Sequence, residues 1–533
     1  AYLLRIVSMT EALPSANRQI ARAAGTVMFA IIFGQLAGLA RSMLIARSFP
    51  AIEQDAFFAA NRVSETLFTL LAAGALGSAF IPTFTGFLAK NEKASAWRLA
   101  SSIANLLTLT LSLLGVLAAI FAPQIVRYAL APGLATDPAT FSMTITLLRI
   151  QLIASVLFGL GGLMVGILNA HQIFFIPQLT IGFYRLGEIF GVLVLARWSG
   201  IYGLAWGVVI GAGLYLLIQV PTLLKQKGTY SPALGLDNPS VREVFRLMGP
   251  RVLGAAVVQL NFWVNTWLAS QMTAGSVAGL QYGFSLMLMA QAAIAQSVAI
   301  AAMPTFSAQF ALGKLDEMRA SLASSLRGVL FFALPASLGL ILLRGPIVAM
   351  LFQRGSSNLQ LTSMIAWALL WYAAGLVGHS VMEVLTRAFY AQHDTKTPVI
   401  IGAIAMGLNV AFSFSFSAFF AKLGWMPLGG LALANSLATA LETTALFVTM
   451  RKRLNGINGR HLSRGVLLSL GGTLAMSLAV LLVLRFGAGL TAWLQAPLGI
   501  AAGGLAYALT MAALRVPELG VLISALRRRL IKN

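Results

Sequence analysis

Polar side chains recur at helical spacing inside a long apolar stretch near the start of this sequence. Gln35, Gly38 and Arg41 follow one another at three-residue intervals, so a helix would place them near one face. Arg41 stands deep in its stretch, where its guanidinium cannot easily reach the aqueous interface. Such an arginine either lines a water-filled cavity or joins an ion pair inside the protein. We favour the cavity, and the sequence leaves the ion pair open.

Two acid–base pairs lie in other apolar stretches of the same half of the chain. Arg62 precedes Glu65, and Arg185 precedes Glu188, each by three residues, a spacing at which helical side chains meet. These pairs are either neutralised structural bridges or cation sites balanced by acids in a wet cavity. Asp55, at the start of the second stretch, either caps its helix or joins the same site.

A further cation and an amide lie near the start of the second half. Arg251 follows Gly249-Pro250, and Asn265 stands further along the same apolar stretch. Guanidinium groups inside a membrane suit an anionic substrate such as a pyrophosphate, because they bind phosphate oxygens in pairs. We therefore predict a substrate-binding set that comprises Gln35, Gly38, Arg41, Asp55, Arg62, Arg185, Glu188, Arg251 and Asn265.

A polar stripe marks another apolar stretch in the second half. His379, Glu383 and Arg387 follow one another at four-residue intervals, so they lie on one helix face. A lone buried histidine is usually structural, whereas one in such a stripe could relay protons. Glu442 has no obvious local partner and could face a cavity. Glu383 and Glu442 are therefore candidate binding residues for a coupling ion.

The amino-acid composition indicates whether these helices lie in water or in a membrane. Of 533 residues, 58% are hydrophobic and 10% are charged, and the mean hydropathy is +0.85. A soluble domain carries about 25% charged residues. The chain contains no cysteine, so disulfides are excluded. The composition excludes a soluble globular protein and a disordered chain, and it predicts an all-α polytopic membrane protein.

The basic residues predict topology rather than nucleic-acid binding. The formal net charge is +22, with 37 Lys and Arg against 15 Asp and Glu. About 24 of the basic residues lie in the termini and even-numbered loops and about 7 in odd-numbered loops, which places both termini in the cytoplasm. We predict fourteen spans, near 26–48, 55–85, 98–122, 142–169, 175–197, 202–224, 245–270, 274–304, 321–343, 361–390, 397–420, 428–450, 465–487 and 493–515.

Short sequence matches indicate an internal repeat. Ile81–Thr85 recurs as Met303–Ser307, and Leu99–Ser102 recurs as Leu322–Ser325, both at an offset of about 222 residues. A repeat of six spans makes the two copies enter the membrane in the same direction. We expect parallel-repeat lobes of six helices each, plus two extra C-terminal helices. The predicted parts are lobe 1–225, cytoplasmic linker 226–243, lobe 244–453, extra helices 454–516 and a basic amphipathic tail 517–533.

No catalytic motif accompanies these spans. The sequence has no Walker A motif, no GxSxG, no clustered metal ligands and no acidic cluster for a metal-bound sugar donor. The loops are also too short for a catalytic domain. We therefore expect no catalytic residues, no metal and no cofactor, and a secondary transporter rather than an enzyme. A membrane glycosyltransferase and a non-transporting cell-wall scaffold are the alternatives from other classes.

Several motifs in the chain resemble the MurJ/MviN lipid II flippase family of the multidrug/oligosaccharidyl-lipid/polysaccharide exporter superfamily. The resemblance runs over nearly the whole chain and includes the fourteen spans. Its most specific motif is Phe389–Val399. The other matching segments are Gly38–Arg41, Ala46-Arg47, Asp55–Phe58, Gly74–Pro82, Met248–Pro250 and Asn265-Thr266.

The resemblance implies a substrate and a mechanism. Such proteins carry undecaprenyl-pyrophosphate-linked lipid II, the peptidoglycan precursor, to the outer leaflet of the bacterial inner membrane by alternating access. The headgroup enters a cationic cavity between the lobes, and the extra helices form a groove for the lipid tail. The resemblance implies coupling to Na⁺, H⁺ or membrane potential. Membrane lipids and cell-wall synthesis enzymes are the expected partners, nucleic acid is not, and we expect a monomer.

The cavity cations of the family are distributed differently in this sequence. Arg41 matches a family arginine, whereas other family arginines fall on Gln35, Phe68-Thr69 and Ser285. A family asparagine position holds Arg185. Arg251 is an additional cation, and Asn409 aligns with an asparagine linked to sodium in some members. Export of another polyprenyl-linked oligosaccharide, or of a drug, is therefore the alternative transport function.

Overall fold

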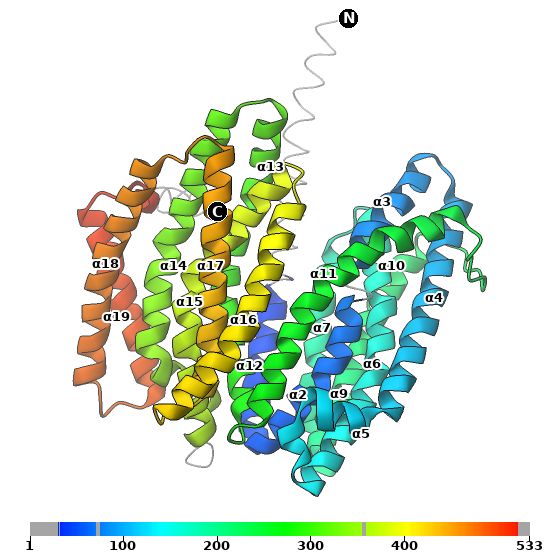
Figure 1. Cartoon of the computed structure of the whole chain (residues 1–533), viewed down its shortest axis with the longest axis horizontal. Coiled ribbons are helices and arrows are strands. Elements are labelled where there is room, and N and C mark those ends of the chain that lie inside the picture. The colour runs from blue at the N-terminus through cyan, green and yellow to red at the C-terminus, as the bar shows by residue number, and fades with distance from the viewer. Residues whose placement is uncertain (1–29, 31, 71–74, 354–358, 521–533) are drawn as a thin grey trace, which may run out of the picture. The chain divides into compact units, whose positions relative to one another are not determined.

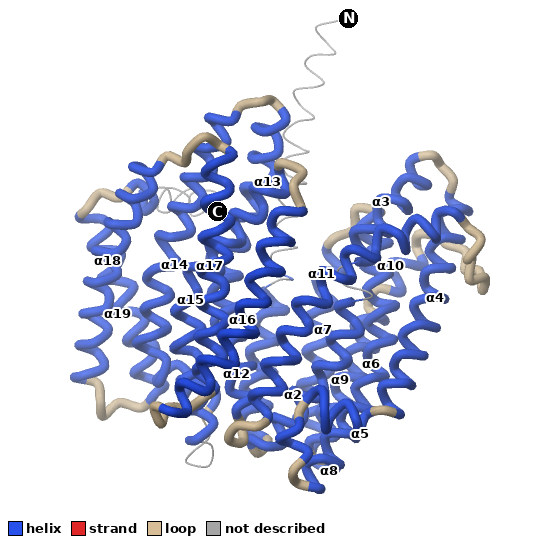
Figure 2. Tube along the Cα trace, viewed as in Figure 1, coloured by secondary structure: helices blue, strands red, loops and turns tan. Residues whose placement is uncertain are grey.

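A computed structural model gives the fold of this protein and describes residue 30 and residues 32–70, 75–353 and 359–520. Throughout these ranges the regular structure is helical and no strand occurs (Figure 2). Helices satisfy every backbone hydrogen bond within one segment, which is what a hydrocarbon environment demands. The prediction of an all-α membrane protein is thus confirmed.

The chain divides into two compact units, 1–259 and 260–533. Within the first unit, α6 is the central helix and packs against α2, α3, α4 and α9, while α7 packs against α9 (Figure 1). A helix over 32–48 precedes them. The labelled elements are α2 (Ala51–Phe68), α3 (Ala75–Ala89), α4 (Lys93–Ile120), α5 (Ala122–Gln124), η2 (Ile125–Leu130), η3 (Pro132–Ala135), α6 (Pro138–Ala170), α7 (Phe175–Phe190), η4 (Gly191–Leu195), α8 (Ala196–Ser199), α9 (Ile201–Leu217) and α10 (Val220–Leu224).

The second unit is built around α15, which packs against α12, α13, α14 and α17. The extra helices α18 and α19 pack against each other and against α14 (Figure 1). The elements are α12 (Ser276–Gln291), η5 (Ala292–Gln296), α13 (Ser297–Ala311), α14 (Leu315–Phe352), α15 (Leu359–Ala391), α16 (Lys396–Lys422), α17 (Leu428–Arg453), α18 (Gly459–Phe486) and α19 (Ala492–Ala513).

One long helix, α11 (Pro239–Ser270), carries the chain from the first unit to the second. Its first turns pack in the core of the first unit through Val241, Val244 and Met248. Residues 239–243, predicted as the end of the linker, form the start of this helix. The division at 259/260 therefore falls inside a helix rather than in a loop.

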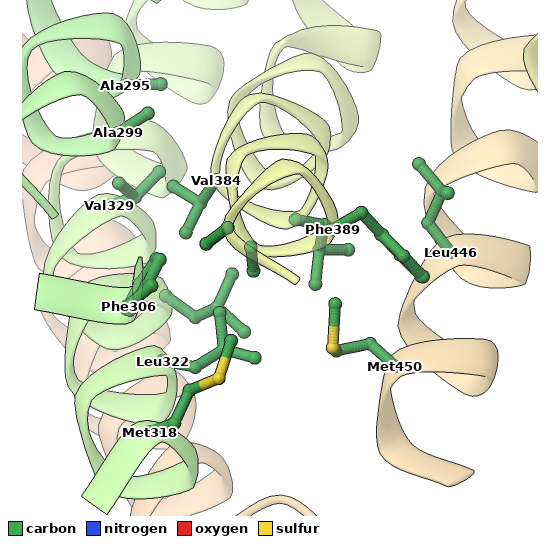
Figure 3. Packing of buried hydrophobic residues seen from close by; sticks show 14 of the residues in the cluster. Ala295, Ala299, Phe306, Met318, Leu322, Val329, Val384, Phe389, Leu446 and Met450 are labelled. Atoms are coloured by element: carbon green, nitrogen blue, oxygen red, sulfur yellow. The ribbon is translucent and has the colours of Figure 1, made fainter. Parts of the chain in front are cut away.

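The internal repeat is visible in the packing of each unit. Phe84 and Leu99 are buried in the core of the first unit, and their repeat partners Phe306 and Leu322 are buried in the core of the second (Figure 3). The central helices α6 and α15 occupy matching positions in the two copies. Each copy also carries its repeated proline inside a helix, in α3 and in α13. The repeated segments thus take matching places in the core of each unit.

Within the described ranges, twelve helices are long and apolar enough to cross a membrane. They correspond to the third through fourteenth predicted spans. The first predicted span corresponds to the helix over 32–48. The second is divided between α2 and α3, and residues 71–74 between them lie outside the described ranges. Of the predicted basic tail, only residues 517–520 lie within them.

Candidate functional site

The helix over 32–48 approaches α7 closely through small residues. Gly34 faces Ile181 and Gly182 of α7, and a Cβ on Gly38 would lie 3.8 Å from Nε of Arg185. Small residues at four-residue spacing let two helix backbones come together in a membrane. The same face, one turn further on, carries Arg41 to the acidic side chain of α7. Gly38 is therefore part of the site as a spacer.

Arg41, Arg185 and Glu188 form one ion cluster, called here the Arg–Glu–Arg triad. Nη2 of Arg41 lies 2.7 Å from Oε1 of Glu188, and Nη1 of Arg185 lies 3.0 Å from Oε2. The Glu188 side chain is 0% exposed, that of Arg41 is 9% exposed and that of Arg185 is 30% exposed. Arg41 thus forms the internal ion pair that the sequence left open, and Arg185 is the accessible cation.

Aromatic rings flank both guanidinium groups of the triad. The Arg185 guanidinium lies 4.9 Å from the ring centroid of Tyr184, and that of Arg41 lies 5.7 Å from the centroid of Phe58. The negative face of an aromatic ring attracts a cation. The rings therefore hold the guanidinium groups in place without neutralising them, because they carry no formal charge.

Backbone contact between α7 and α9 fixes the position of the buried carboxylate. A Cβ on Gly187 would lie 2.2 Å from Cα of Gly211, and one on Gly191 would lie 2.7 Å from Cα of Gly207. These distances allow only glycine at the crossing. Glu188 follows Gly187 directly, so it sits on a helix that cannot move away from its neighbour without opening this contact.

Arg62 and Glu65 pair with each other on α2, as predicted. Nη1 of Arg62 donates to Oε2 of Glu65 over 2.9 Å. Asp55 is buried in the second turn of α2, and because that helix begins at Ala51 after Pro50, the helix-capping interpretation of Asp55 is wrong. Gln35 is exposed on the helix over 32–48.

Arg251 and Asn265 lie at different places along α11. Arg251 is exposed in the part that belongs to the first unit. Asn265 belongs to the second unit and accepts a hydrogen bond from Ser413 Oγ of α16 over 3.1 Å. The predicted binding residues therefore lie on the helix over 32–48, α2, α7 and α11, and the triad joins the first and third of these helices.

Asn265 is part of a buried amide cluster between α11 and α16. Nδ2 of Asn265 donates to Oδ1 of Asn261 over 3.2 Å, and Nδ2 of Asn409 donates to the same oxygen over 3.3 Å. Oγ of Ser413 lies within 3.2 Å of Oδ1 of Asn409. Ser413 was not among the residues predicted from the sequence, although its four-residue spacing from Asn409 places the two on one helix face. All four side chains are uncharged.

The polar stripe on α15 separates into two contacts. Nε2 of His379 lies 3.1 Å from Oδ1 of Asn435 on α17, and Nη2 of Arg387 lies 3.1 Å from Oε1 of Glu383. Glu442 of α17 lies against α16, where its Oε1 would be 3.1 Å from a Cβ on Gly402. Among the described residues, no group of three His, Cys, Asp or Glu side chains could hold a metal ion.

Comparison with known proteins decides the family. The model of the lipid II flippase MurJ family matches residues 49–497. Lipid II flippase MurJ of Burkholderia cenocepacia is 31% identical over 441 residues, which is 81% of this chain and 84% of the relative. The chain belongs to the MurJ family. A protein of Rhizobium meliloti named "Probable lipid II flippase MurJ" is 29% identical over 86% of this chain and 84% of the relative.

Solved structures share the fold of this chain. A lipid II flippase MurJ in an inward closed conformation aligns with a TM-score of 0.76 at 24% identity and covers 92% of this chain and 98% of its own. An inward-facing multidrug resistance transporter of the MATE family aligns with a TM-score of 0.67 at 15% identity and covers 79% and 94%. At these identities the likeness concerns the fold alone.

The most specific MurJ motif of the chain, Phe389–Val399, has a structural explanation. Asp394 accepts hydrogen bonds from the backbone N–H of Thr397 over 2.9 Å and from its hydroxyl over 2.6 Å, and it forms an ion pair with Arg453 at the end of α17. Burial raises the pKa of the carboxyl, but these bonds outweigh it and bring the pKa to about 2. The motif thus joins the start of α16 to α17, and the sequence analysis missed Arg453.

Proposed function

We propose that this protein translocates lipid II from the cytoplasmic to the outer leaflet of the bacterial inner membrane by alternating access of its two units. A relative at 31% identity carries the name lipid II flippase MurJ. The observation that carries the proposal within this chain is the Arg–Glu–Arg triad, two guanidinium groups on one carboxylate inside a membrane-spanning unit.

The charge of the triad fits a phosphorylated headgroup. Two arginines and one glutamate leave a surplus of one positive charge on the first unit at this place. A guanidinium binds phosphate oxygens through paired, charge-assisted hydrogen bonds. Arg185, with the more accessible side chain, meets the headgroup first, and Arg41 follows. Arg62, Arg251 and Asn265 remain proposed further contacts along the translocation path.

We propose that transport is secondary, driven by an ion gradient or the membrane potential. The candidates for ion coupling are Asn409, Glu383 and Glu442. Asn409 lies in a cluster without formal charge, and Glu383 is already paired with Arg387, so Glu442 is the carboxylate with the most freedom to bind a cation. We propose a monomer with both termini in the cytoplasm, acting beside cell-wall synthesis enzymes.

Complementation tests the function directly. The gene is expressed in a bacterium depleted of its own lipid II flippase, and survival and accumulated lipid II are measured. Rescue with normal lipid II levels is expected. A chain that reaches the membrane in normal amounts but neither rescues growth nor lowers lipid II would reject lipid II as the cargo.

A second candidate function is export of another polyprenyl-linked oligosaccharide. It is favoured by the neutral side chains of Gln35 and Ser285, which stand where the resemblance places arginines in the family. Mass spectrometry of lipid that co-purifies with the chain distinguishes the two, because the headgroup mass differs while the undecaprenyl pyrophosphate is shared.

A further inference from the structure

The Glu188 side chain is buried in the first unit and lies between two cationic partners. Its side chain is 0% exposed, and its ion pairs in the described part of the chain are with Arg41 and Arg185. Both partners are the cations proposed to bind the headgroup. Whatever draws the arginines toward a phosphate therefore removes the positive charges that lie beside the Glu188 carboxylate.

In the described part of the chain, the other groups around Glu188 include a phenol, glycine backbone and an ion pair on α2. On α7, Tyr184 interacts with Glu188 through its hydroxyl. The α9 side is glycine backbone, at Gly207 and Gly211. On α2, Arg62 is held by Glu65, and Glu65 is a second acid within electrostatic reach of Arg185.

A buried carboxylate without a counter-charge is more costly than a protonated one. The triad alone carries one positive charge. A pyrophosphate diester brings about two negative charges, because each phosphate keeps one ionised oxygen. With Glu188 ionised, the assembly would carry one net negative charge in a low-dielectric site. With Glu188 protonated it would be neutral.

We propose that Glu188 takes up one proton when a phosphorylated headgroup binds to Arg41 and Arg185, so that headgroup binding and proton uptake are one event. This inference rests on the proposed function. A proton from water joins one carboxylate oxygen of Glu188, the two ion pairs open, and the guanidinium groups bond to phosphate oxygens. When the headgroup leaves, the arginines return to Glu188 and the proton is released to water.

The linkage predicts how affinity depends on pH. If one proton is bound with each headgroup, the dissociation constant rises tenfold for each unit of increasing pH wherever Glu188 is ionised in the free protein and protonated in the complex. The probe must not titrate itself, so an undecaprenyl-pyrophosphoryl disaccharide is suitable, since a pyrophosphate diester has no phosphate that titrates near neutral pH.

Calorimetry on the purified full chain in nanodiscs tests the proposal. Binding of the disaccharide probe is measured near neutral pH in several buffers of different ionisation enthalpy, and the slope gives the protons taken up per molecule bound. About one proton is expected for the wild-type chain. Glu188→Gln is expected to bind the probe with near-zero proton uptake and with affinity that no longer varies with pH.

Glu317→Gln is the control, because it removes an exposed acid that pairs with Lys314 in the second unit, away from the triad, and it should keep the proton uptake. The wild-type buffer series alone decides the question if Glu188→Gln fails to fold. Wild-type binding without proton uptake would overturn the inference and leave the proposed function standing. No binding of the probe to a folded wild-type chain would reject both.

Discussion

Several charged side chains inside the membrane-spanning helices form ion pairs within the protein. Arg41 and Arg185 share one buried acid, Arg62 is paired with Glu65, and Glu383 is paired with Arg387. Removing the partner of a charge in a simple pair strands that charge and lowers stability as well as binding, whereas Glu188 keeps one arginine when the other is lost. Single-residue tests must therefore separate the two effects.

Arg41→Ala is expected to abolish transport at normal expression. The variant loses one charge-assisted contact to the phosphate, about 1.5–3 kcal/mol, which corresponds to roughly a ten- to hundredfold weaker interaction. Complementation of a flippase-depleted strain checks the variant, with immunoblotting to confirm membrane levels. Full rescue by Arg41→Ala would exclude a role in headgroup binding.

Arg185→Asn separates the structural and the functional role of the second arginine. If Arg185 contacts the headgroup, affinity for the pyrophosphate probe falls by roughly tenfold or more while thermal stability changes little, since Arg41 still holds Glu188. A purely structural pair would instead lower the unfolding temperature and leave the affinity of the folded fraction unchanged.

The ion pair of Asp394 predicts a dependence of stability on acid pH. The folded pKa of about 2 lies below the ordinary aspartate pKa of 3.8, so the carboxylate stabilises the fold above about pH 4. This contribution is lost as the pH falls from about 4 through 2. Unfolding temperatures of the wild-type chain and Asp394→Asn should therefore differ near neutral pH and converge at low pH. A difference that is constant with pH would contradict the assignment.

At the scale of elements, glycine decides which helices can touch. The helix over 32–48 and α9 both approach α7 through glycines, and this brings Arg41 within reach of Glu188. Helices in a membrane gain little from burying apolar side chains against one another, so close backbone packing and polar contacts hold them together. The site therefore depends on glycines, which carry no charge themselves.

Gly187→Ala is expected to destabilise the first unit, because the new Cβ would lie 2.2 Å from the Gly211 backbone. Overpacking of this kind costs about 1–3 kcal/mol. Gly213→Ala on α9 is the matched control, since no atom lies within 4 Å of its added Cβ. Thermal unfolding of the purified variants checks the pair, and equal unfolding temperatures would contradict the tight α7–α9 crossing.

At the scale of the whole molecule, the charge distribution predicts the orientation of the chain in the membrane. The sequence lacks cysteine, so single cysteines can be introduced without background. Lys90→Cys lies in an even-numbered loop and Gly489→Cys in an odd-numbered one. A membrane-impermeant maleimide added to intact spheroplasts should label Gly489→Cys and spare Lys90→Cys until the membrane is opened. The reverse labelling would invert the predicted topology.

The sequence by itself determined the class of the protein and much of its architecture. Apolar runs of membrane length predicted the spans, and the matches around Pro82 and Pro304 predicted two copies of one unit, whose cores contain Phe84 and Phe306. The pairs Arg62–Glu65 and Arg185–Glu188 were also predictable, because residues three apart on a helix must lie close together.

Only the tertiary structure decided which helices pack together, and therefore which polar and charged side chains come into contact. The contact of Arg41 with Glu188, the amide cluster of Asn265 with Ser413, and the bond from Arg453 to Asp394 all join different helices. Hydrophobic periodicity predicts which face of a helix is buried. In a chain whose helices are apolar on nearly every face, it cannot predict which neighbouring helix that face packs against. That choice depends on where glycines allow backbones to approach, a property of pairs of helices that no single segment contains.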